Sequence, residues 1–197
     1  MRIKIYRVVL LSFVLALISS CDLTRVGGEG DIYPASAGNT WVYYDEVTES
    51  GRTFTMFAPV QHDDGFQVYP INIESDGYLL QSIYLYGDDA GLYYYYSLQS
   101  IPDNRWQLAA FPLVVGSVWE FDYRSTVDFQ LYHIVGVLEE VENVESEGII
   151  YNDCYRIHFS GDANETLWFC PGVGVVRDIG HSSYGGYILK LESYALY

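Results

Sequence analysis

Hydrophobic and polar residues follow short, strand-like patterns along most of the chain. The segment 52–60 reads RTFTMFAPV, while the segments 78–86 (YLLQSIYLY) and 92–98 (LYYYYSL) are rich in aromatic and other apolar residues. Successive side chains of a strand point to opposite faces, and aromatic and β-branched residues are enriched in strands. These three segments therefore predict β-strands.

Clusters of glycine, aspartate and serine recur between the apolar segments. They fall at positions 49–51, 75–77, 87–91, 146–148, 161–163 and 181–186. Turn signals at such short spacing are typical of antiparallel β-sandwiches and barrels. We expect an all-β fold, a curved antiparallel sheet forming a half-barrel or a barrel or sandwich, with about 10–12 strands.

One segment is ambiguous between helix and strand. Val135, Leu138, Val141 and Val144 recur every three residues, which could form one face of a helix. The segment contains a glycine, is followed by another, and is rich in β-branched residues, which disfavour helices. We favour a bent strand.

The hairpin 153–170 can be assigned a register. If residues 161–163 form a three-residue loop, Arg156 faces Trp168 and Cys154 faces Cys170. Facing Cα atoms of antiparallel strands lie about 4.5–5.5 Å apart, which a disulfide can span. This register predicts a disulfide between Cys154 and Cys170, an apolar opposite face, and stacking of Arg156 on Trp168.

The N-terminus carries an export signal. Residues 1–7 contain three basic residues and no acid, and an apolar run follows over 8–18. The run is shorter than the roughly 20 residues that span a bilayer. It ends in ISSC, which resembles the bacterial lipobox and implies cleavage before Cys21 and attachment of lipid, palmitate included, to its thiol.

This signal divides the chain into three parts. Residues 1–20 are expected to be the signal peptide, 21–32 a glycine-containing flexible tether, and 33–197 a single β domain. The predicted partner is therefore a membrane, contacted through the N-terminal lipid anchor, and the predicted location is the cell envelope. The lipid would hold the protein at the periplasmic face of the inner or outer membrane, or at the cell surface.

Composition excludes some partners. Half of the residues are hydrophobic and the mean hydropathy is +0.05, as expected for a folded core. Without residues 1–20 the chain retains seven basic and 26 acidic residues, a formal charge of −19. A field of this sign opposes binding to nucleic acid and to anionic headgroups.

A phrase of eleven residues occurs twice. The segments 33–43 (YPASAGNTWVY) and 111–121 (FPLVVGSVWEF) share the pattern aromatic-Pro-x-x-x-Gly-x-x-Trp-x-aromatic at an offset of 78 residues, which continues without a gap to position 60. Proline ends strand pairing, glycine permits a tight turn, and tryptophan opens a strand. The repeat predicts two halves of a sheet entered by the same turn. The alternative is that Trp41 and Trp119 form two ligand-binding ledges.

The same residues carry a resemblance to known proteins. YPASAGNTWVYY is similar to the opening YFPL-x-x-GN-x-W-x-Y of a group of uncharacterised bacterial lipoproteins. The segments 141–154 and 168–176 (WFCPGVGVV) resemble the group's AGTF and PGVGLV motifs, although IIY replaces the usual TF in the first. The resemblance implies a curved half-barrel like that of periplasmic lipoprotein carriers, and it implies no shared activity.

No constellation of catalytic or metal-binding residues is present. The four histidines are widely separated and lack the spacing of a metal site, so neither a metal nor a cofactor is expected. The segment 180–184 (GHSSY) departs from the nucleophile elbow of hydrolases, because tyrosine stands where that motif needs glycine.

The run of tyrosines at 93–96 is the remaining candidate. Alternation places Tyr93 and Tyr95 on one face of a strand and Tyr94 and Tyr96 on the other. An exposed row such as Tyr93 and Tyr95 could bind a sugar or a lipid, whereas the alternative is ordinary packing of half-buried strands.

Together these features predict a membrane-anchored lipoprotein without enzymatic activity, with a binding or structural role. The alternative is a carrier that holds a lipid or another hydrophobic ligand in a β half-barrel. The expected partners are accordingly an envelope protein or a hydrophobic ligand.

Lipidation can be tested directly. Labelled palmitate should enter the wild-type protein expressed in a bacterial host and should be absent from the Cys21→Ser variant, because acylation requires the thiol. Wild-type protein that incorporates no label would contradict the assignment of Cys21.

Overall fold

The structure is a computed structural model that describes residues 33–182 and 185–197. The expected signal peptide, tether and Cys21 lie outside these residues. The described residues form strands and turns without a helix, so none of them belongs to a helix that could span a membrane. The strands are β1 Thr40–Asp45, β2 Ser50–Met56, β3 Val60–Gln61, β4 Gln67–Ser75, β5 Tyr78–Asp88, β6 Gly91–Tyr95, β7 Arg105–Ala110, β8 Val118–Arg124, β9 Leu131–Ser146, β10 Ile149–Gly161, β11 Glu165–Cys170, β12 Gly174–Ser182 and β13 Gly185–Ala195.

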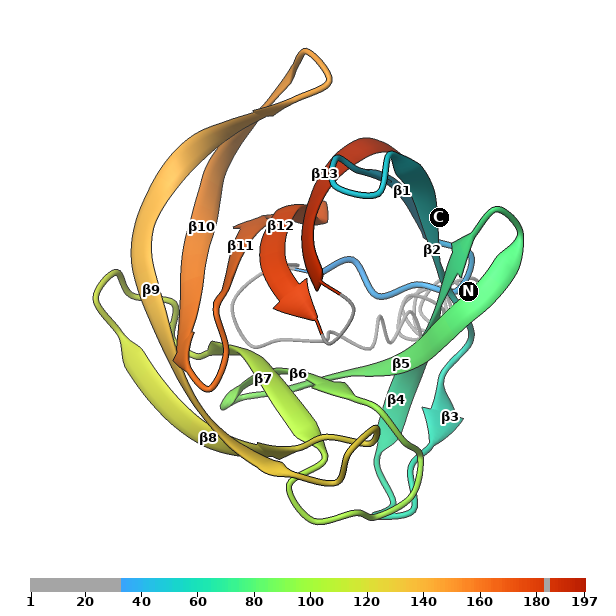
Figure 1. The fold of residues 1–197 in the computed structure, drawn as a ribbon, viewed down its shortest axis with the longest axis vertical. Coiled ribbons are helices and arrows are strands. Elements are labelled where there is room, and N and C mark those ends of the chain that lie inside the picture. The colour runs from blue at the N-terminus through green and yellow to red at the C-terminus, as the bar shows by residue number, and fades with distance from the viewer. Residues whose placement is uncertain (1–32, 183–184) are drawn as a thin grey trace, which may run out of the picture.

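All strand pairs are antiparallel, and the sheet curls into a nearly closed barrel (Figure 1). Its order is β7-β6-β5-β4-β2-β1-β13-β12-β11-β10-β9-β8, with β3 paired to β4 beside this path. The predicted all-β fold is confirmed. The ambiguous segment is also a strand, since it lies within the sixteen residues of β9.

The barrel closes without a ladder between its first and last strands. Strands β7 and β8 face each other across a seam, where the Trp119 indole Nε1 donates to the backbone carbonyl of Gln107 at 3.2 Å. At one end of the seam the Arg124 backbone N–H donates to the Asp103 carbonyl at 2.7 Å. A side chain and a single main-chain bond thus replace the regular pairing of strands.

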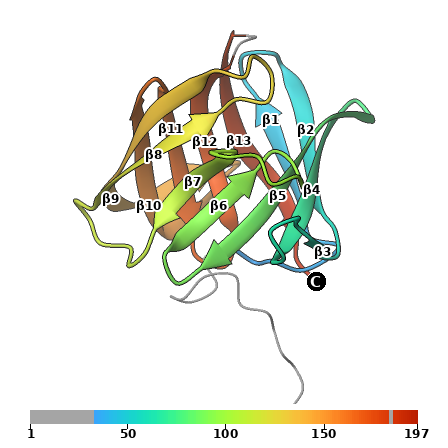
Figure 2. The ribbon, with the colours of Figure 1, turned by 90° about the horizontal axis from the view of Figure 1, so that it is seen from below.

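The N-terminal segment covers one end of the barrel. Residues 33–39 cross that end, where the C-terminus also lies (Figure 2). The ring of Tyr33 enters the interior and packs against Trp41 and Phe169, with ring centroids 5.3 and 5.7 Å apart. Asn39 fixes the segment, because its amide donates to the Pro34 carbonyl at 2.6 Å and accepts from the Tyr197 N–H at 2.8 Å.

The repeated phrase forms the same turn twice. Both glycines have positive φ, +96° at Gly38 and +90° at Gly116, a region that side chains disfavour. Gly38 N–H donates to the Met56 carbonyl and Gly116 N–H donates to the Leu138 carbonyl, at 2.9 and 2.8 Å. In each copy the partner residue donates back to the residue after the glycine, Asn39 or Ser117. The predicted common turn is confirmed.

The prediction that the repeat continues without a gap to position 60 is wrong. The partner strands of the two copies are offset by 82 residues, from Met56 to Leu138, rather than by 78. Four additional residues therefore lie between the phrase and its partner in the second copy. They fall where the loop between β8 and β9 turns back.

The register of the hairpin β10–β11 is confirmed. Arg156 pairs with Trp168, and Cys154 forms a disulfide with Cys170 across a Cα–Cα distance of 4.1 Å. The opposite face is buried as expected, with Ile157, Phe159, Leu167 and Phe169 at most 2% exposed.

The predicted stacking partner of Trp168 is wrong. The guanidinium over its ring belongs to Arg177, 5.0 Å from the centroid. Arg156 instead forms ion pairs with three glutamates on the neighbouring strand β9, because pairing with β9 brings them beside it: Glu139, Glu140 and Glu142.

Removing the disulfide should destabilise the barrel. Serine at both Cys154 and Cys170 should lower the free energy of unfolding by about 3 kcal/mol in urea denaturation, since the crosslink closes a loop of 16 residues. Mass spectrometry under non-reducing conditions should detect the crosslinked peptides in the wild type. Two free thiols in protein isolated from the envelope would contradict this pairing.

Candidate functional site

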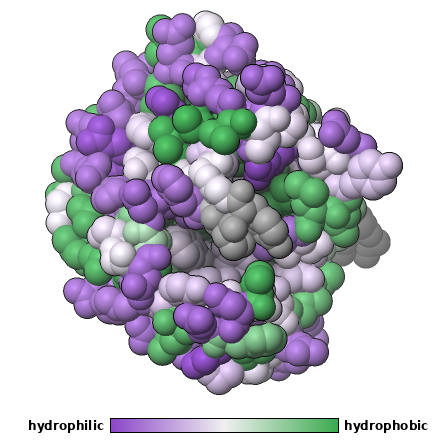
Figure 3. All heavy atoms as spheres, viewed as in Figure 1, coloured by the Kyte–Doolittle hydropathy of each residue, from purple (hydrophilic) through white to green (hydrophobic). Residues whose placement is uncertain are grey.

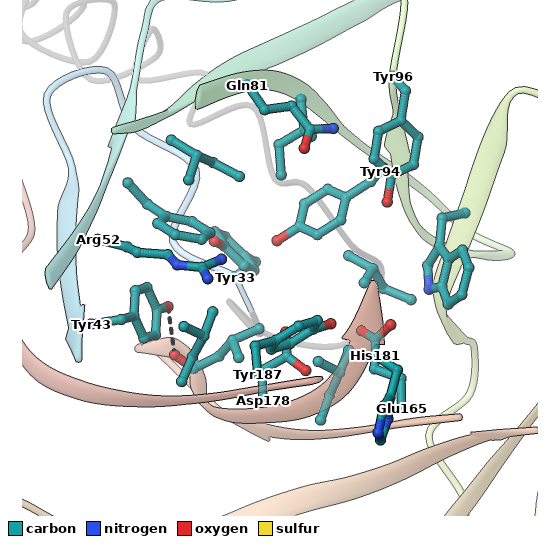
Figure 4. A pocket seen from close by; sticks show the side chains of 18 residues that line it. Tyr33, Tyr43, Arg52, Gln81, Tyr94, Tyr96, Glu165, Asp178, His181 and Tyr187 are labelled. Carbon is teal, nitrogen blue, oxygen red and sulfur yellow. Dashed lines mark hydrogen bonds between the residues drawn. The ribbon is translucent and has the colours of Figure 1, made fainter. Parts of the chain in front are cut away.

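A cavity of about 290 Å³ lies inside the barrel (Figure 4). Strands from both halves of the curled sheet contribute to the wall of the cavity, together with Tyr33 from the segment that covers one end. Its polar residues other than tyrosine are Arg52, Gln81, Glu165, Asp178 and His181. The remaining lining residues are Tyr33, Tyr43, Phe54, Ile73, Ile83, Tyr94, Tyr96, Trp106, Leu108, Leu167, Val175, Tyr187 and Leu189.

Aromatic residues limit the cavity to one part of the interior. Trp106 packs against Phe121 and Phe159, with ring centroids 5.5 and 5.4 Å apart. Trp119 also packs against Phe159, at 6.1 Å. These contacts fill the space beside β8, β9 and β10, so the cavity lies between the tyrosines of β6 and the strands β11–β13.

The run of tyrosines divides as alternation predicted, and the inward pair is Tyr94 and Tyr96. Both line the cavity, and Tyr94 forms a hydrogen bond with Tyr33. Burial raises the pKa of both hydroxyls well above the usual value. At neutral pH these groups are therefore neutral hydrogen-bonding groups on an aromatic wall.

Two carboxyl groups face the interior from neighbouring strands. Glu165 on β11 and Asp178 on β12 lie beside the hydroxyl of Tyr187 on β13, which forms hydrogen bonds with both (Figure 4). A glycine makes this approach possible. A Cβ added to Gly180 would lie 2.5 Å from the Tyr187 hydroxyl oxygen and 3.2 Å from Cγ of Glu165.

A β-bulge turns Asp178 inward. Phe169 pairs with Val175, but the preceding Trp168 pairs with Arg177, so β12 has one extra residue at Val176. Alternation from the inward Val175 would otherwise place Arg177 in the cavity. The shift instead places Asp178 inside and leaves Arg177 over Trp168 on the outer face.

Desolvation dominates the electrostatics of the pair. Burial raises the pKa of Glu165 to about 7, against the lowering effect of its hydrogen bond with Tyr187. Burial and the neighbouring charge of Glu165 raise the pKa of Asp178 well above its usual value. One oxygen of Asp178, Oδ1, is buried without a hydrogen-bond partner. The cavity thus holds carboxyl groups that the residues around them do not fully stabilise in the charged form.

The cation in the wall is already paired. Arg52 forms an ion pair with Asp45, whose side chain is fully buried. Burial alone would raise the pKa of Asp45, but hydrogen bonds from Val47, Thr48 and Ile188 and the charge of Arg52 hold it below its usual value. Arg52 therefore neutralises Asp45 first and acts on Asp178 only as a weaker, more distant charge.

The four aromatic residues predicted as ligand-binding lie elsewhere. Trp41 and Trp119 are buried, and their indole N–H groups donate to the carbonyls of Val173 and Gln107. Tyr93 and Tyr95 point away from the cavity. Tyr93 packs on Tyr86, and Arg105 lies over its ring, 5.1 Å from the centroid. The structure thus places none of the four in the wall of the cavity.

A second pocket lies outside the seam. It has a volume of about 450 Å³ and is bordered by Tyr95, the loop before β7 and the outer residues of β7 and β8. The amide of Asn104 is buried there without a hydrogen-bond partner, whereas the acidic residues around it are exposed. Across residues 33–182 and 185–197, no group of three or more histidine, cysteine, aspartate or glutamate side chains is arranged to hold a metal ion.

Comparisons with known proteins do not identify the chain. No protein-family model matches the sequence, and no curated protein matches it significantly. Among solved structures it is similar to a protein of Bacteroides fragilis NCTC 9343 described as exported, with a YmcC-like fold, at 13% identity and a TM-score of 0.44 over 83% of this chain and 98% of that one. It is also similar to a protein of Parabacteroides distasonis ATCC 8503 described as a lipoprotein, at 14% identity and a TM-score of 0.42 over 84% and 99%.

The resemblance to the group of bacterial lipoproteins rests on the sequence motifs alone. Membership of that group stays a prediction.

The sequence contained a signal for only part of the cavity. The register of the hairpin 153–170 places Glu165 opposite Phe159, on the apolar face, and a carboxylate among inward residues indicates a polar interior. Asp178 could not be found in this way, because its orientation depends on the bulge at Val176.

The raised carboxyl pKa values predict how stability depends on pH. A carboxyl group whose pKa is higher in the folded protein than in the unfolded chain stabilises the fold fully below the unfolded value and loses this effect as the pH rises. The free energy of unfolding should therefore fall between about pH 4.5 and pH 7, by roughly 2–3 kcal/mol for Glu165.

The Glu165→Gln variant isolates this effect, because glutamine cannot ionise. In urea denaturation across this pH range it should lack this fall, and at pH 8 it should be more stable than the wild type. Parallel pH profiles of the two proteins would contradict the raised pKa of Glu165.

Proposed function

We propose that this protein is a lipid-anchored binding protein of the bacterial cell envelope that holds a small ligand inside its barrel and has no enzymatic activity. The observation that carries this proposal is the cavity inside the barrel, walled by tyrosines, leucines and isoleucines around two incompletely stabilised carboxyl groups. Ligand sites are commonly concave and apolar, with a few polar groups that fix the ligand's orientation. The wall of this cavity has that character.

The size of the cavity limits the ligand. Its volume of about 290 Å³ is near the lower end of the range for ligand pockets, roughly 300–1,000 Å³. The space suits a small molecule better than a whole membrane lipid. Of the two functions expected from sequence, we therefore favour a carrier, and we restrict its ligand to a small molecule.

The position of the chain ends favours loading from the side away from the membrane. Residues 33–39 cover the end of the barrel at which the described chain begins (Figure 2). The strand registers place Arg52, Gln81 and His181 toward the other end. The twelve residues from Cys21 to Tyr33 can reach at most about 40 Å. An anchor at Cys21 would thus keep the covered end near the bilayer and leave the opposite rim facing solvent.

The rim has a mixed surface. In the space-filling view down the barrel, hydrophilic residues predominate around the centre, with separate hydrophobic groups between them (Figure 3). Such a rim suits exchange of a water-soluble ligand. The acidic charge of the chain also agrees with the expectation that nucleic acid is not a partner.

Filling the cavity tests the proposal. Hexan-1-ol, used as a probe, should bind the wild-type protein saturably and change the fluorescence of Trp106, which lines the cavity. Ile83→Phe places a larger side chain in the same space and should weaken this binding by about tenfold or more. Because Ile83 borders the cavity, the added ring atoms can extend into it, and the variant should fold normally.

Leu80→Phe on the same strand provides the matched control, since Leu80 is 57% exposed and Ile83 only 4%. It should bind hexan-1-ol like the wild type. Equal binding by Ile83→Phe and Leu80→Phe would show that the probe does not occupy the interior, and the proposed function would fail.

A further inference from the structure

We propose that the cavity selects organic ammonium ions, small amines whose charged nitrogen lies between Glu165, Asp178 and Tyr187 and whose apolar part contacts the aromatic wall. This inference rests on the proposed function and names the chemical class of its ligand.

The first argument is the unbalanced charge of the wall. A buried charge is costly unless an opposite charge or hydrogen bonds compensate it. Glu165 and Asp178 share the hydroxyl of Tyr187, whose one O–H can donate to only one of them at a time, and Asp178 Oδ1 is buried without a partner. An ammonium group supplies up to three N–H donors and one positive charge, which is what this pair lacks.

The second argument is that no cation of the wall meets this need. Arg52 is paired with the buried Asp45, and its guanidinium carbon lies 6.0 Å from the centre of the Tyr187 ring. His181 is exposed at the end of β12. The other lining residues on β11, β12 and β13 are apolar, apart from the phenol of Tyr187. The negative charge that Glu165 and Asp178 can carry is therefore not balanced by positive charge from the residues that line the cavity.

The third argument is the aromatic wall opposite the carboxyl groups. Tyr94 and Tyr96 point into the cavity from β6 and the residue that follows it (Figure 4). Trp106, which pairs with Tyr94 across β6 and β7, also lines the cavity. Aromatic faces attract cations, most strongly where water is excluded. A carboxylate ligand would gain nothing from these faces and would be repelled by the acidic pair.

Three probes of equal length separate the possibilities: hexylammonium, hexan-1-ol and hexanoate. Their binding to the purified protein is measured by isothermal titration calorimetry at pH 7.5. Hexylammonium should bind about tenfold or more tightly than hexan-1-ol, because its hydrogen bonds to the pair are charge-assisted, and hexanoate should bind most weakly.

Proton release provides a second readout. Without a cationic ligand the carboxyl pair is partly protonated near neutral pH, and an ammonium ion favours its charged form. Binding of hexylammonium should therefore release protons, detected as a heat that depends on the ionisation enthalpy of the buffer. Hexan-1-ol should release none.

Two variants locate the effect. Glu165→Gln and Asp178→Asn keep the shape of each side chain, and each should reduce the preference for hexylammonium over hexan-1-ol by about fivefold or more. Glu147→Gln, at an exposed turn, is the control for a general loss of negative charge and should change neither affinity.

The outcomes distinguish the two proposals. Hexan-1-ol and hexylammonium binding with equal affinity, or hexanoate binding most tightly, would overturn the ammonium assignment and leave a cavity for neutral or acidic ligands. Failure of all three probes to bind would overturn the proposed function itself. A preference for hexylammonium that survives both cavity variants would place the cation elsewhere and would also overturn this assignment.

Discussion

The sheet passes through twelve hydrogen-bonded strands and curls back on itself, so it encloses more space than its backbone can fill. Barrels of about eight strands are just wide enough for their inward side chains to pack. This wider barrel is filled on one side by Trp106, Trp119, Phe121 and Phe159 and is covered at one end by Tyr33. The cavity is the space that remains, and its position follows from where these large rings are placed.

The same constraint explains the carboxyl pair. A residual cavity between tyrosines and strands β11–β13 tolerates polar groups better than a packed core, because they need not contact apolar side chains on all sides. The bulge at Val176 and the absence of a side chain at Gly180 then bring Asp178, Glu165 and Tyr187 together. Local backbone irregularities thus determine the chemistry of an otherwise apolar interior.

Most of the architecture could be predicted from sequence, because strand periodicity and turns are local signals. The register of 153–170 followed from a single loop length, and it correctly brought Cys154 to Cys170. The site could not be predicted to the same extent. The choice between Tyr93 and Tyr94 as inward residues depends on the curvature of the sheet, and the orientation of Asp178 depends on one extra residue in β12. Both are properties of the assembled barrel.

The pairing of β1 with β13 joins residues about 150 positions apart, and the Asn39 amide adds a bond to Tyr197. Contacts of such long range form late, since the intervening chain must first be brought together. In a chain that leaves the cytoplasm with its N-terminus first, β1 could pair early with β2, but its other edge would stay open until β13 emerged. The secretion machinery would accordingly handle an open, unfolded chain, and the interior would come into being only after translocation ends.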